Sequence, residues 1–109
     1  MELSRDFILI NQTFIKSKQA KALEADMGAI GVIMLMFFWC EMFKRQVNIN
    51  SLSASEVRKM ATNEHFHPPV DFLARIEAAG FLHRTESGRL KWRPAFVRGI
   101  NSLPDRRGR

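Results

Sequence analysis

The chain has 109 residues, which is enough for one domain with a modest hydrophobic core and too few for two such domains. Its content of 46% hydrophobic and 26% charged residues excludes an intrinsically disordered chain. The formal net charge of +6 arises entirely after Gly80, where eight Lys and Arg residues accompany only two acidic residues. This density of positive charge favours a polyanionic partner, although a basic tail that only aids solubility would have the same composition.

Residues suited to catalysis or metal binding are few. Cys40 is the only cysteine, so no intrachain disulfide is possible and a cytoplasmic location is expected. Met1–Asp6 has mixed charge and no adjoining run of signal-peptide type, which agrees with that location. No glycine-rich phosphate loop or nucleophile elbow occurs, and nothing near Cys40 would lower its pKa, so we expect no enzyme. His65, His67 and His83 lack further ligands at suitable spacing, so neither a metal nor another cofactor is expected.

The first predicted elements form an N-terminal extension over residues 1–26. The apolar run Phe7–Ile10 is either extended or the first turn of a helix. Residues 17–25 have a helix-forming composition, and Ser17 is a suitable N-cap for them. The main domain is predicted to follow over residues 27–98.

A central apolar helix is predicted over residues 28–43. The segment from Met27 to Cys40 carries no charge and falls well short of the roughly 20 residues that cross a bilayer. Asp26 and Glu41 bound it closely, so a core helix is favoured over a membrane span, and no membrane partner is expected. A helix that is apolar on every side is buried or shared with a partner. We therefore predict core packing for most of this helix and a homodimer through the rest.

A short strand and a capped helix are predicted next. Gln46–Asn50 alternates polar and apolar residues, the period of a half-buried strand. Ser53 and Glu56 have the spacing of a capping box at the start of a helix. The helix is expected to end near Asn63, in the left-handed conformation that asparagine tolerates.

A second helix, a hairpin and a tail complete the predicted order. The helix spans Pro68–Ala79, because proline is well suited to a first helical position, and Gly80 is its expected C-cap. Residues 81–93 contain two extended pieces around a short glycine-containing turn, which predicts a hairpin. Residues 99–109 lack periodicity and are predicted to be a basic, disordered tail.

Together these elements predict a mostly α (α+β) fold: a winged helix-turn-helix with a central apolar helix and a C-terminal two-stranded wing. The stretches GVIMLMFFWCEMF, SASEVRKMA and FLARIEAAGFL resemble the N-terminal winged-helix domain of DnaD-type replisome organisers and related phage replication proteins. The resemblance implies a role with nucleic acid or a replisome. Such organisers carry a further C-terminal domain, whereas this sequence ends after its basic tail. It is equally similar to small winged-helix regulators of phages and mobile elements.

The predicted wing supplies the main candidates for phosphate contact. If Leu90 and Trp92 face the core, then Arg89, Lys91 and Arg93 alternate onto the opposite side. The complete set of predicted nucleic-acid contacts is Asn63, His65, His67, Arg75, Arg84, Arg89, Lys91, Arg93 and Arg98.

Two functions remain open at this point, because the predicted recognition helix is poorly suited to reading bases. Its single cation, Arg75, is outnumbered by Asp71 and Glu77, so the preceding turn would have to supply base contacts. The first hypothesis is a protein that binds double-stranded DNA, as a replication accessory or a transcriptional regulator. The second is a non-catalytic protein-interaction module, such as a phage-encoded inhibitor of a host polymerase, replisome or defence complex, whose basic wing meets an acidic partner.

Overall fold

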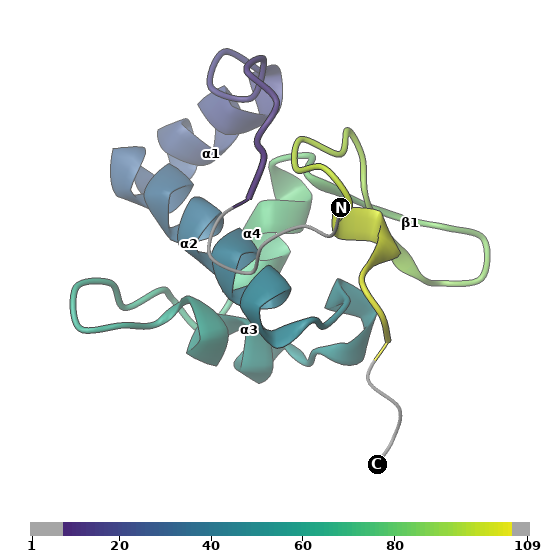
Figure 1. Cartoon of the computed structure of the whole chain (residues 1–109). Coiled ribbons are helices and arrows are strands. Elements are labelled where there is room, and N and C mark those ends of the chain that lie inside the picture. The colour runs from purple at the N-terminus through teal and green to yellow at the C-terminus, as the bar shows by residue number, and fades with distance from the viewer. Residues whose placement is uncertain (1–7, 106–109) are drawn as a thin grey trace.

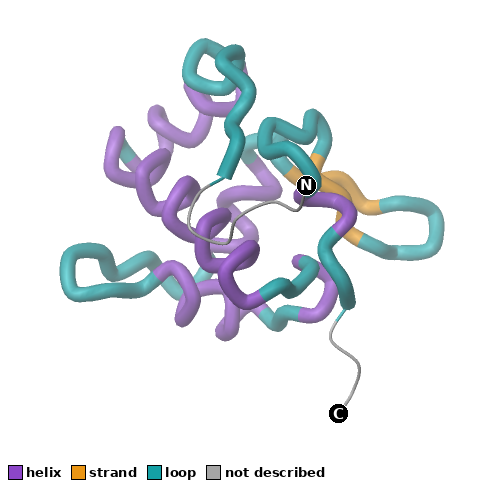
Figure 2. The backbone as a smooth tube through the Cα atoms, in the orientation of Figure 1, coloured by secondary structure: helices purple, strands orange, loops and turns teal. Residues whose placement is uncertain are grey.

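The computed structural model describes residues 8–105 as four α-helices, two short 3-10 helices and one two-stranded antiparallel sheet (Figure 1). Figure 2 shows that the strands are confined to a hairpin at one side of a helical body. The prediction of a mostly α (α+β) fold is confirmed. In chain order the elements are α1 (Lys18–Met27), α2 (Ala29–Arg45), η1 (Ile49–Ser51), α3 (Ala54–Ala61), α4 (Phe72–Ala78), β1 (Leu82–Arg84), β2 (Leu90–Trp92) and η2 (Ile100–Ser102).

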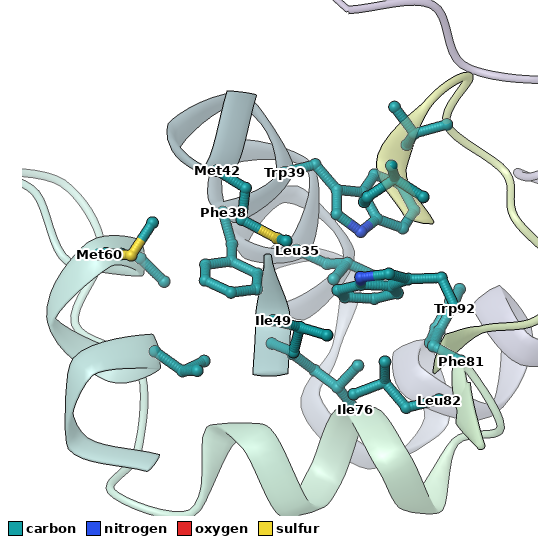
Figure 3. Close-up of a cluster of buried hydrophobic side chains, with 14 of the residues drawn as sticks. Leu35, Phe38, Trp39, Met42, Ile49, Met60, Ile76, Phe81, Leu82 and Trp92 are labelled. Carbon is teal, nitrogen blue, oxygen red and sulfur yellow. The ribbon is translucent and has the colours of Figure 1, made fainter. Parts of the chain in front are cut away.

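The apolar segment forms α2 at the centre of the core, as predicted (Figure 3). Its inward side buries Leu35, Phe38 and Trp39, which are at most 1% exposed. The ring of Trp39 lies edge-to-face with that of Trp92 in β2, at a centroid distance of 5.7 Å. Gly28, at a φ of 82°, separates α1 from α2, and the two helices are bent by 117°. No single helix within residues 8–105 is long and apolar enough to span a membrane. Only α1 and α2 taken together, with the bend between them, reach that length and apolar composition.

The N-terminal segment contributes to the same core. Ile10 forms an isolated antiparallel bridge with Val97, so the apolar run is extended, one of its two predicted conformations. Phe7, the first residue of that run, lies outside the described residues. Phe14 is fully buried, and its ring centroid lies 5.0 Å from that of Trp39. The burial of Phe14 therefore ties residues before α1 to the central helix.

Two predicted helix N-caps are confirmed. The Ser17 hydroxyl accepts a hydrogen bond from the backbone N–H of Ala20, at 3.1 Å. The Ser53 hydroxyl accepts from the backbone N–H of Glu56, and the Glu56 carboxylate accepts from the backbone N–H of Ser53, at 3.2 and 2.8 Å. Both caps satisfy N–H groups that have no partner inside the first turn of a helix.

The prediction of a strand at Gln46–Asn50 is wrong. Gln46 takes the left-handed conformation that ends α2, and the 3-10 helix η1 follows. The Asn48 side chain accepts from the backbone N–H of Asn50, a local bond that competes with strand pairing. Val47 and Asn48 are both buried, so the alternation in the sequence does not reflect a strand with one exposed side.

The end of α3 also differs from the prediction. The helix stops at Ala61 and Thr62 is extended, so Asn63 does not close it in the left-handed conformation. Instead the Asn63 carboxamide oxygen accepts from the backbone N–H groups of His65 and Phe66, at 2.6 and 3.0 Å. These bonds fold the α3–α4 loop into an asparagine-led turn.

The helix α4 begins later than predicted, at Phe72 and not at Pro68. The Pro68 carbonyl accepts from the Arg58 guanidinium of α3 at 2.8 Å, so it takes no part in a helical turn. The N–H of Phe72 bonds instead to the Pro69 carbonyl, at 3.1 Å. At the other end Gly80 has a φ of 99° and terminates the helix, which agrees with the predicted cap.

The predicted hairpin is confirmed, whereas the disordered tail is not. In the antiparallel sheet Leu82 pairs with Trp92, and both side chains are buried. The prediction of disorder from residue 99 is wrong for residues 99–105, because Ile100 and Leu103 insert into the core. The buried Asn48 side chain donates to the Leu103 carbonyl at 2.9 Å, which holds this segment in place. The rest of the predicted tail, residues 106–109, lies outside the described residues.

Candidate nucleic-acid interface

Two asparagine side chains hold the free edge of β2. Leu90 donates its N–H to the Asn50 carboxamide and accepts a bond from it, at 2.6 and 2.8 Å. Trp92 makes the same pair of bonds with Asn101, both at 2.9 Å. The two carboxamides thus occupy the edge where a third strand would otherwise pair, which fixes the hairpin on the body. Nothing in the local sequence marks Asn50 or Asn101, because their partners lie 40 and 9 residues away.

The register of the hairpin sets which side chains face solvent. Leu82 and Trp92 are paired and face the core. His83 pairs with Lys91, so these two side chains lie together on the outer side of the sheet, and both are exposed. Arg93 directly follows β2 and is exposed as well.

Arg75 of α4 is held by two carboxylates. Its guanidinium lies 2.9 Å from the Asp71 carboxylate and 3.1 Å from that of Asp26, at the end of α1. The hydrogen bond that Arg75 donates to Asp71 and the charge of Asp26 raise the pKa of Arg75. A shallow groove beside Arg75 is lined by small side chains of α1 and α4, among them Ala22 and Ala74. The exposed side of α4 is therefore acidic and alanine-rich, with its one cation engaged.

Two hairpin arginines of the predicted set are engaged as well. Arg84 lies 3.2 Å from the Glu77 carboxylate of α4. Arg89 lies 3.0 Å from the Asp105 carboxylate, in the segment that follows η2. Both guanidinium groups are more than half exposed, so the pairs are open to solvent and weak. Their positive charge is nonetheless balanced locally.

Other exposed cations lie before and at the start of α1, in β2 and in the segment that follows β2. The backbone N–H of Arg98 donates to the Leu9 carbonyl, and that of Asn11 donates to the Phe96 carbonyl, so residues 9–11 and 96–98 run side by side. A shallow groove between them is lined by Lys16, Lys18, Pro94 and Phe96, among others. We call the five exposed cations of residues 16–18 and 91–98 the basic band, and none of them forms an ion pair with a carboxylate of residues 8–105. The basic band consists of Lys16, Lys18, Lys91, Arg93 and Arg98.

The basic band overlaps only partly with the predicted set. Lys91, Arg93 and Arg98 were predicted from the sequence, whereas Lys16 and Lys18 were not. The two lysines flank the cap of α1, and only the tertiary fold brings them beside residues 94–96. No sequence signal of local range could have indicated this neighbourhood.

The three polar residues of the α3–α4 loop lie elsewhere. Figure 1 shows this loop projecting from the side of the molecule opposite the hairpin. His65 and His67 are exposed, and the imidazole of His65 lies 3.2 Å from the Glu64 carboxylate. The side chain of Asn63 is occupied by the turn described above. The structure therefore does not bring these residues together with the basic band.

Comparison with known proteins found no matching family model, no matching curated protein and no matching solved structure. The resemblance to DnaD-type organisers accordingly stays a prediction. Within residues 8–105 no group of three or more His, Cys, Asp or Glu side chains is arranged to hold a metal ion. The distribution of charge and the fixed hairpin are therefore the features of residues 8–105 that bear on function.

Proposed function

We propose that this chain is a winged-helix protein that binds double-stranded DNA through phosphate contacts, as a replication accessory or regulator of a phage or mobile element. In this assignment α2, α3 and α4 are the three helices of the motif, and β1 with β2 is the wing. The observation that carries the proposal is the basic band. We infer that these five exposed cations, which have no carboxylate partner among residues 8–105, act together to attract a polyanion and release its counterions.

The proposal assigns the contacts to phosphates and not to base edges. A helix that reads the major groove presents Arg, Lys, Asn or Gln near its start. The start of α4 offers Asp71 and Ala74 instead, and Arg75 is paired with carboxylates on both sides. Phosphate contacts fix position without reading sequence, so binding of low sequence specificity is expected.

The fixed hairpin supports this proposal. Trp92 is 2% exposed and anchors β2 in the core, while Asn50 and Asn101 hold its edge. Lys91 and Arg93 are therefore presented from a backbone that is already ordered. Binding to such a surface costs less conformational entropy than binding that has to order a flexible arm of the protein.

A titration with a labelled duplex of about 20 base pairs, at salt concentrations of about 50 and 200 mM, tests the proposal. Binding should weaken steeply with salt, and the double change Lys91→Ala with Arg93→Ala should reduce the slope of log K against log [salt] by about 2. The matched control is Arg75→Ala, which removes a surface arginine already paired with Asp71 and Asp26 and should leave the slope unchanged. Absence of duplex binding at the lower salt concentration, or an unchanged slope in the double variant, would refute the proposal.

One observation favours the second hypothesis, a non-catalytic protein-interaction module. The exposed side of α4 combines Asp71 and Glu77 with a groove of alanine side chains shared with α1. Such a surface repels phosphates and suits a protein partner, such as a polymerase, replisome or defence-complex subunit. The substitution Asp71→Lys, which reverses the charge at this position, separates the two functions. It should strengthen duplex binding if DNA lies along α4, and it should weaken the binding of a protein docked there.

A further inference from the structure

The helix α2 carries an apolar stripe that the fold leaves uncovered. Ile30 and Ile33 are 46% and 47% exposed, although the opposite side of the same helix is fully buried. The half-buried Phe37 and the exposed Cys40 continue the line toward the C-terminal end of the helix. The intervals of three, four and three residues are those of a coiled-coil seam. We call Ile30, Ile33, Phe37 and Cys40 the α2 stripe.

The α3–α4 loop extends this apolar surface. The ring centroid of Phe66 lies 6.5 Å from that of Phe37, in an edge-to-face arrangement. Val70, further along the same loop, is 73% exposed. The helical spacing of the α2 stripe makes its apolar surface contiguous, and a contiguous exposed apolar surface marks an interaction site in a folded protein.

We propose that a second copy of this chain covers the α2 stripe, with the two α2 helices antiparallel about a two-fold axis between residues 33 and 37. Ile33 then faces the partner's Phe37, and Ile30 faces the partner's Cys40. The inference stands on this apolar stripe and does not rest on the proposed function.

The spacing of the stripe indicates that its occupant is another α2 helix. A seam with intervals of three and four residues is filled by a helix with the same spacing, whose side chains enter the gaps between those of the first. A two-fold contact uses the same patch on both copies, so the patch has to be complementary to itself. The α2 stripe meets this condition, because small and large apolar side chains exchange places across the axis.

The charges at the two ends of α2 favour the antiparallel arrangement. Lys44 continues the line of the stripe, and Arg45 follows it in the last turn. Asp26 lies just before the start of α2 and is 46% exposed, even though it pairs with Arg75. Antiparallel helices place the cationic end of one copy beside the acidic end of the other, and their dipoles oppose. Parallel helices would instead place Lys44 against the partner's Lys44.

The concentration dependence of the sedimentation coefficient tests the dimer. The stripe is small compared with the roughly 800 Å² that each partner buries in a standard interface. We therefore expect a dissociation constant of tens of micromolar, which protein concentrations from about 1 to about 300 μM would bracket. Ile33→Asp places a charge at the centre of the seam and should weaken the dimer about 100-fold. The matched control is Ile15→Asp, at an isoleucine that is 62% exposed and lies outside α2, and it should leave the dimer unchanged.

Both variants change exposed side chains, so the far-ultraviolet circular dichroism spectrum and the melting temperature should stay close to those of the unchanged chain. A chain that is monomeric throughout the concentration series would overturn the proposal. A dimer that is equally sensitive to the two substitutions, or indifferent to Ile33→Asp, would place the contact elsewhere and would also overturn it.

Disulfide crosslinking tests the direction of the helices. Partial burial of the Cys40 thiol raises its pKa, and the charge of Glu41 raises it further, so we choose mild oxidation at an alkaline pH of about 8.5. In the antiparallel dimer Ile30→Cys faces the partner's Cys40 and should give a covalent dimer in high yield. Residues 30 and 40 of one helix are about 15 Å apart, which prevents a disulfide within one chain.

The unchanged chain, which has Cys40 alone, is the control. Two Cys40 residues in the antiparallel dimer lie about 15 Å apart along the helices and should not crosslink. A disulfide dimer of the unchanged chain, or no covalent dimer of the Ile30→Cys chain above the dissociation constant, would refute the arrangement.

Discussion

Replacement of Phe14 by alanine should lower the free energy of unfolding by about 3 to 5 kcal/mol, which is a large part of the stability of a domain of this size. Phe14 is fully buried, and its ring centroid lies within 6 Å of three aromatic rings of the core. Those rings belong to Trp39, Phe81 and Phe96. Truncation to alanine leaves a cavity at the point where α2, the hairpin and the following segment converge. Urea unfolding followed by tryptophan fluorescence measures the loss.

The neighbouring residue provides the control for this prediction. Ile15 is 62% exposed, so Ile15→Ala should change the free energy of unfolding by no more than about 0.5 kcal/mol. The same comparison tests whether the residues before α1 unfold together with the core. Equal stability of the Phe14→Ala and Ile15→Ala chains would mean that this segment unfolds independently of the core.

Loss of the asparagine carboxamides at the edge of β2 has the second largest expected effect. Asn50→Ala and Asn101→Ala each remove two hydrogen bonds from partly buried peptide groups of β2. Each substitution should cost about 2 kcal/mol, and the double variant about 4 kcal/mol. Hydrogen exchange gives a residue-specific reading, because the amides of Leu90 and Trp92 should lose protection while those of α2 keep theirs.

Asn11→Ala is a suitable control for the asparagine substitutions. Among residues 8–105 the Asn11 carboxamide bonds only to Thr13, in an exposed turn, so its loss should cost less than about 1 kcal/mol. If Asn50→Ala left the exchange of Leu90 unchanged, the hairpin would be held by its core side chains alone. The wing of the proposed DNA-binding surface would then depend on Trp92 and not on the edge bonds.

Local chemistry accounts for the parts of the fold that the sequence predicted correctly. The caps at Ser17 and Ser53 form between residues three positions apart, so spacing alone identifies them. The apolar composition of α2 likewise predicts a central helix without knowledge of its neighbours. The alternation of Leu90, Lys91 and Trp92 correctly separated the inner and outer sides of β2.

The incorrect predictions share a different cause, because long-range bonds decide those segments. Asn48 bonds to the Leu103 carbonyl across 55 residues, which orders both the turn after α2 and the C-terminal segment. The Pro68 carbonyl is taken by Arg58, which delays the start of α4. The pattern of apolar residues in a sequence does not predict such distant hydrogen-bond partners.

The candidate interface was predicted only in part for the same reason. The sequence does not show which arginines are paired with a carboxylate. In the fold Arg75 pairs with Asp26, 49 residues away, and Arg89 pairs with Asp105. The cations without such partners were therefore indistinguishable from the paired ones. Lys16 and Lys18 lie beside Pro94 and Phe96 only because residues 9–11 and 96–98 run side by side.

The carboxamides of Asn50 and Asn101 have a consequence for how this molecule can associate. An exposed strand edge is a template on which another chain can add a strand, and it promotes aggregation as well as peptide capture. Here the outward N–H and C=O groups of Leu90 and Trp92 already have partners. That edge is closed to sheet extension, so other molecules have to recognise this side of the hairpin through its side chains and not through its backbone.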